Sequence, residues 1–79
     1  MITVNVKLFA SLQKQYPGHP LGRPMPVQLP DHSTLDHLIH HLNLTDAKII
    51  LVNGIAQTDG NHLLRDNDEL AIFPLLAGG

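Results

Sequence analysis

The stretch LRDNDELAIFP, residues 64–74, places a turn signal directly before an apolar strand. Within it, Leu70 and Ile72 alternate with other residues, and we expect Pro74 to lie on the same side of the strand. At the other end of the chain, MITVNVKLF (1–9) alternates apolar and polar residues, which predicts a second strand with one buried face. These two segments carry the clearest apolar patterns, so we expect them at the centre of one sheet.

The segment DHSTLDHLIHHLNL predicts the main helix. Ser33 or Thr34 can cap its first turn, and Ser33-x-x-Asp36 resembles a capping box with Asp in place of Glu. Apolar residues then recur at helical spacing and form one stripe for the core: Leu35, Leu38, Ile39 and Leu42.

Shorter segments complete the pattern. Strands are predicted at 27–29, 47–52 and 55–57, and the last strand at 69–73. A two-residue hairpin turn at Asn53-Gly54 joins 47–52 to 55–57. Proline and glycine predict a loop over 17–26, and ASLQKQ after the first strand predicts a turn of helix. The order strand, strand, helix, strand, short strand, strand predicts a single α+β domain over residues 1–79. We expect a β-grasp (ubiquitin-like) fold, with a mixed four- to five-stranded sheet and one main helix on one face.

Composition excludes several classes of function. The 79 residues include no cysteine, so disulfides, cysteine-based zinc sites and cysteine nucleophiles are absent. The net charge of −2, with no basic run, gives no reason to expect nucleic-acid binding. The longest apolar run, LAIFPLLA, is far shorter than the ~20 residues of a membrane span, and the start of the chain lacks a signal-peptide pattern. We therefore expect a cytoplasmic soluble protein that does not enter a membrane.

Four motifs carry a family resemblance: LFASL (8–12), VNG (52–54), LRDNDELAIFP (64–74) and the final Gly-Gly. In their order and spacing they resemble the MoaD/ThiS family of sulfur carrier proteins, and most closely its MoaD branch, the small subunit of molybdopterin synthase. Asn67 stands where the family usually has glycine, and asparagine also suits a left-handed turn position. Leu75-Leu76 replaces the family's usual Pro-Val or Pro-Ile, at a position that would lie against the partner protein.

The resemblance implies how the protein works. An adenylating enzyme of the ubiquitin-activating type would use ATP to activate the carboxyl group of Gly79, and a sulfur donor protein would convert it to a thiocarboxylate. The sulfur would pass into molybdopterin inside a larger, MoaE-like synthase subunit. The carrier would be a co-substrate that binds no cofactor of its own. Its partner-binding residues would be Phe73, Pro74, Leu75, Leu76, Ala77 and Gly78.

The residues themselves support a role for this terminus. Pro74 has no N–H to donate, so sheet pairing should weaken or stop there and leave 74–79 as an extended tail. Six residues at ~3.3 Å each reach ~20 Å, and glycines can enter a narrow channel. Without cysteine, the terminus is the only plausible carrier of transferable sulfur. At least one of Phe73, Leu75 and Leu76 should be exposed, which favours a partner interface.

Three rival functions remain open. The chain is also compatible with a sulfur carrier for thiamine thiazole or tungsten-cofactor synthesis, with a ubiquitin-like protein modifier, or with a binding module whose tail is inert. His37, His40 and His41 should lie on the solvent side of the helix, where weak metal binding is the alternative to a plain solvated face. We predict no metal site there.

Overall fold

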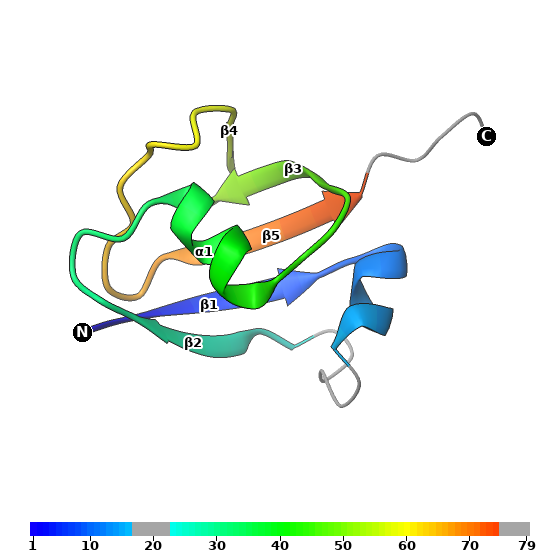
Figure 1. The fold of residues 1–79 in the computed structure, drawn as a ribbon, viewed down its shortest axis with the longest axis horizontal. Coiled ribbons are helices and arrows are strands. Elements are labelled where there is room, and N and C mark those ends of the chain that lie inside the picture. Colours follow the sequence, from blue (N-terminus) through cyan, green and yellow to red (C-terminus); the bar gives the residue numbers. More distant parts are fainter. Residues whose placement is uncertain (17–22, 75–79) are drawn as a thin grey trace.

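The computed structural model describes residues 1–16 and 23–74, and these residues form one mixed sheet with a helix across one of its faces (Figure 1). Its five strands lie in the order β2-β1-β5-β3-β4. The predicted β-grasp arrangement is confirmed. The elements in chain order are β1 (Ile2–Leu8), the 3₁₀ helix η1 (Ala10–Gln15), β2 (Met25–Leu29), α1 (Leu35–Leu42), β3 (Ala47–Val52), β4 (Ile55–Gln57) and β5 (Glu69–Pro74).

The first and last strands lie at the centre of the sheet, as their apolar patterns predicted. They run parallel, with Val6 opposite Leu70, and β2 and β3 flank them as antiparallel neighbours. Both central strands alternate strictly, so one side of each is buried beneath α1. The same alternation places the remaining side chains on the opposite, uncovered face.

The core lies between α1 and this sheet. Leu35, Leu38 and Leu42 are buried and Ile39 is half-buried, which confirms the predicted stripe. Aliphatic residues supply every fully buried large side chain among the described residues: Leu8, Leu12, Leu29, Leu38, Leu70, Ile72, Val4 and Val6.

Two strand boundaries differ from the predictions. Strand β2 begins at Met25 rather than at residue 27, and it includes Pro26. An edge strand tolerates proline because the missing N–H points away from the sheet. Strand β5 continues through Pro74, which pairs with Ala47 and is buried, so the prediction that the strand ends at residue 73 was one residue short. The rest of the predicted tail, 75–79, lies outside the described residues, as does 17–22 within the predicted loop.

The start of α1 shows which candidate cap operates. Thr34 Oγ1 accepts a hydrogen bond from the His37 N–H at 3.2 Å, so Thr34 is the N-cap. Ser33 instead donates its hydroxyl to the Pro30 carbonyl at 2.6 Å, and the predicted Ser33–Asp36 capping box is therefore wrong. The Leu35 and Asp36 N–H groups are bonded to carbonyls of the 60–62 loop.

The other end of α1 is held by η1, a contact that joins segments distant in sequence. Tyr16 donates its hydroxyl to the Leu42 carbonyl at 2.5 Å. The Gln15 side-chain amide bonds both backbone groups of Thr45, at 2.9 and 3.0 Å. The Tyr16 bond satisfies a carbonyl of the helix C-terminus that has no partner within the helix itself, and the Gln15 bonds fix the loop that follows.

Both predicted asparagine turns adopt left-handed backbone conformations. Asn53 and Gly54 have φ values of 51° and 84°, as a type I′ hairpin turn requires. Asn67 has φ 70°, which confirms that it takes the left-handed position that the family usually gives to glycine.

Candidate partner-binding face

The uncovered face of the sheet is the first candidate for a functional site. Helix α1 covers only the other face (Figure 1), and the strand register assigns the less buried alternate residues of the three inner strands to this one. Apolar residues gather toward the carboxyl end of β5, where Ile49 of β3 pairs with Phe73 and Leu51 pairs with Ala71. Ile49 is 45% exposed. A strand surface this apolar is expected against a core, yet no element of the described chain covers it.

An aromatic pair is the most distinctive feature of this face. The rings of Phe9 and Phe73 stack with their centroids 4.3 Å apart and an interplanar angle of 13°. Phe9 directly follows β1, and its N–H donates to the Ile72 carbonyl at 3.1 Å, which fixes it beside β5. Both side chains are half-buried, so part of each ring is available to another molecule.

A shallow hollow of about 520 Å³ extends from the aromatic pair across the face. Its apolar lining includes Leu51 and Ala71, and Lys7 and Glu69 stand at its polar margin. An apolar centre with a charged rim is the usual composition of a protein interface. The surface suits another folded protein better than a small polar ligand.

The predicted site residues divide between this face and the undescribed terminus. Phe73 lies on the open face, as expected of a partner-binding residue, whereas Pro74 is buried on the helix side. Leu75, Leu76, Ala77, Gly78 and the predicted sulfur-bearing Gly79 lie outside the described residues. Sequence reasoning missed Phe9. The alternation of residues 2–9 puts Phe9 on the same face as Lys7, so the sequence pattern was sufficient to predict an aromatic side chain on the open face.

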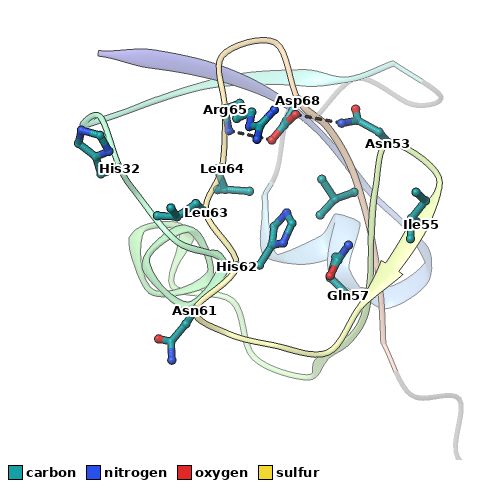
Figure 2. Close-up of a pocket in the computed structure, with 11 residues that line it drawn as sticks. His32, Asn53, Ile55, Gln57, Asn61, His62, Leu63, Leu64, Arg65 and Asp68 are labelled. Carbon is teal, nitrogen blue, oxygen red and sulfur yellow. Dashed lines mark hydrogen bonds between the residues drawn. The ribbon is translucent and has the colours of Figure 1, made fainter.

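A second hollow lies at the opposite end of β5 (Figure 2). Asp68 stands beside it, only 8% exposed, between the VNG hairpin and the turn that precedes β5. Its carboxylate accepts hydrogen bonds from the Asn53 side-chain amide at 2.9 Å and from the Arg65 N–H at 2.8 Å. Asn53 Oδ1 in turn accepts from the Glu69 N–H at 2.9 Å.

The bonds between Asn53 and Asp68 join two turns, and both residues direct their polar atoms at each other or at backbone. Such saturation is what a buried polar group requires, and it leaves little capacity for catalysis. The VNG motif is thus a turn with a structural anchor.

The histidines of α1 lie as predicted on the solvent side. His37, His40 and His41 are all exposed. Within residues 1–16 and 23–74, no group of three or more His, Asp or Glu side chains is arranged to hold a metal ion.

With the fold and the open face in view, comparison with known proteins identifies the family. The ThiS family model matches residues 6–79, nearly the whole chain. The chain belongs to the ThiS family. This is the MoaD/ThiS group of ubiquitin-fold sulfur carriers and modifiers, as the resemblance indicated.

Several solved structures have a similar fold. The small archaeal modifier protein 1 of H. volcanii is 23% identical with a TM-score of 0.76, and the match covers 96% of this chain and 100% of that one. A Pyrococcus furiosus protein assigned as subunit 1 of molybdopterin converting factor is 22% identical, with a TM-score of 0.72 and coverage of 96% and 100%.

A third similar structure contains a partner protein. It is the complex of subunits 1 and 2 of molybdopterin-converting factor from Helicobacter pylori, whose matching chain is 18% identical. The TM-score is 0.64, and the match covers 99% of this chain and 100% of that one. The search of curated proteins finds no match. Among the described residues, no helix is long and apolar enough to cross a membrane.

Proposed function

We propose that this protein is a sulfur carrier whose Gly79 carboxyl is adenylated and then converted to a thiocarboxylate, and that it serves as the small subunit of a molybdopterin synthase. The observation that carries the proposal is the ThiS family match, which extends through Gly79. The chain contains no cysteine, so a terminal carboxyl is the remaining group on which it could carry sulfur.

The chemistry proceeds in two displacements. A terminal carboxylate oxygen attacks the α-phosphate of ATP, so that pyrophosphate leaves and the glycyl adenylate forms. A sulfide-level sulfur nucleophile then attacks the acyl carbon, the C–S bond forms, and AMP leaves with the oxygen. The product is a thiocarboxylate, which is ionised near neutral pH and nucleophilic. The catalytic groups belong to the activating enzyme and the synthase, and the carrier itself needs no bound cofactor.

The open face supplies the docking surface in this proposal. Phe9, Phe73 and Ile49 lie where β5 leads toward the terminal residues, so a partner that packs on them also approaches the reactive end. Aromatic side chains are frequent hot spots of protein interfaces. The larger synthase subunit and the activating enzyme would use this surface in turn.

Intact mass tests the chemistry directly. After incubation with a cognate activating enzyme, ATP and a sulfur donor, the chain should gain about 16 Da, as sulfur replaces oxygen. A tandem mass spectrum should place the gain on Gly79. An unchanged mass with an enzyme that thiocarboxylates its own carrier would reject the proposal.

A second experiment tests the docking surface. Phe73→Ala should weaken binding to the larger synthase subunit by about tenfold or more, because truncated aromatic hot spots cost ~2 kcal/mol. The matched control is Ile55→Ala, since Ile55 is 65% exposed and lies in β4, beside the second hollow. Equal loss from the two variants would reject the open face as the docking surface.

A modifier function is the second candidate, favoured by the likeness to the small archaeal modifier protein. In that case the activated Gly79 would form isopeptide bonds with lysines of other proteins. Proteolytic digests of cells that express the chain would then contain lysines with a Gly-Gly remnant. Carriers for thiamine thiazole or tungsten cofactor share the terminal chemistry, and the synthase that co-purifies with the chain distinguishes them.

A further inference from the structure

The outer edge of β2 has an unusual backbone. Asn5 pairs with Pro26, yet its N–H donates to the Asp68 carbonyl on the opposite side at 2.8 Å. Thr3 pairs with Gln28, and its N–H and carbonyl bond residues 66 and 67 at 2.8 and 2.7 Å. Residues 26 and 28 therefore form non-hydrogen-bonded pairs with β1, and their own backbone groups point to the outer edge of the sheet.

Proline recurs at this edge and directly beside it. Pro26 lies within the strand, and Pro24 and Pro30 continue the same two-residue spacing directly before and after it. Of the four alternate positions, only Gln28 retains an N–H. An added strand would find carbonyl acceptors at residues 26 and 28 but a donor only at Gln28, and the Pro30 carbonyl already accepts from the Ser33 hydroxyl. The added strand would therefore leave its own carbonyls unpaired. Each unpaired buried polar group costs about 1–3 kcal/mol.

The other edge of the sheet is protected differently. Strand β4 has only three residues. The Asn53 N–H donates to the Glu69 carbonyl on β5, so the backbone groups of the neighbouring residue Val52 face β4, where Val52 pairs with Ile55. By the same alternation, only Ala56 of β4 directs its backbone N–H and carbonyl to the outer edge. A three-residue edge is a poor template for strand addition. Strand β2 has five residues and would be the better template, and it is the one that carries the prolines.

We infer that Pro24, Pro26 and Pro30 close the β2 edge to strand addition by a second copy of this chain. The surface available for association is then the open face, where contact depends on side-chain packing rather than backbone pairing. This last step rests on the proposed function, whereas the closure of the edge does not. The arrangement keeps an apolar sheet protein monomeric while its docking face stays uncovered.

Sedimentation velocity over a wide range of protein concentration tests the inference. The double variant Pro24→Thr/Pro26→Thr restores two outward N–H groups and should associate at least about tenfold more tightly than the native chain. Gln28→Thr is the matched control, because it changes an outward side chain without adding an N–H, and it should remain monomeric. Amide exchange at residues 24–28 should slow in the double variant as its dimer forms.

A double variant that keeps the native circular dichroism spectrum and stays monomeric would overturn the inference, as would a native chain that dimerises through 25–29. If the double variant fails to fold, Pro24→Thr alone carries the test, since Pro24 precedes β2. Pro26→Lys restores the N–H with a charged edge side chain, and it should associate less than Pro26→Thr. None of these measurements requires the partner enzymes, so they are independent of thiocarboxylate formation at Gly79.

Discussion

The two faces of β5 both carry apolar side chains, but folding covers only one of them. On one face, Leu70, Ile72 and Pro74 are buried beneath α1. On the other, Ala71 and Phe73 are only half-buried, and the described chain provides no cover for them. Apolar surface that folding leaves uncovered contributes little to the free energy of unfolding, and remains available for binding. The comparison predicts that substitutions on the two faces will separate stability from partner binding.

The largest expected effect is on the covered face. Ile72→Ala should lower the free energy of unfolding by about 3 kcal/mol, because Ile72 is fully buried and its truncation leaves a cavity. Urea denaturation measures the change. Ile72→Val removes one methylene and should cost about 1 kcal/mol, which provides a milder variant if the first does not fold. A cost for Ile72→Ala no greater than for Phe73→Ala would break the comparison.

The anchor at the start of β5 should rank second. Asp68→Ala removes the buried carboxylate that accepts hydrogen bonds from the Asn53 amide and the Arg65 N–H, and should cost about 2 kcal/mol. Asn61→Ala, on the rim of the same hollow but exposed, should cost less than about 0.5 kcal/mol. Equal melting temperatures for the two variants would show that the Asn53–Asp68 bonds do not stabilise the fold.

The open face should show the smaller stability effect. Phe73→Ala loses the stack on Phe9 but creates no core cavity, so it should cost about 1 kcal/mol in urea denaturation. Phe73→Leu keeps apolar area without the ring and should cost less. A loss as large as that of Ile72→Ala would mean that the aromatic pair is part of the core rather than a docking feature.

The smallest effect should come from an exposed ion pair at the start of β1. The N-terminal ammonium of Met1 lies 2.8 Å from Asp31 and, by hydrogen bonding and charge, lowers the pKa of that carboxyl below its ordinary value. The pKa of Asp31 is therefore lower in the folded protein than in the unfolded chain. The ion pair stabilises the fold fully when the pH is above the pKa of the unfolded chain. This contribution is lost as the pH falls through the pKa of the folded protein. Asp31→Asn should therefore slightly reduce the drop in melting temperature between pH 7 and pH 2. An unchanged drop would show that the pair contributes nothing measurable, as holds for many surface pairs.

Local patterns were sufficient for much of the fold. Alternation identified β1 and β5 and the buried side of each, and Asn53-Gly54 identified the hairpin. The ends of strands and helices were harder to predict where one residue type is compatible with two local structures. Pro26 predicts a loop when the sequence is considered alone, but an edge strand accommodates it. Ser33 and Thr34 are equally good cap candidates in the sequence, and only the hydrogen bond from Ser33 to the Pro30 carbonyl distinguishes them.

The sequence by itself determined the β-grasp order of elements, the two-faced alternation of the central strands and the family motifs that end at Gly79, because each depends on residues close together in the chain. Only the tertiary structure decided that Phe9 stacks on Phe73, that Asp68 anchors Asn53, and that Pro26 turns its backbone to the outer edge of the sheet. These features depend on strand register between distant segments. Register is set by the packing of the whole core and is not encoded in any single stretch.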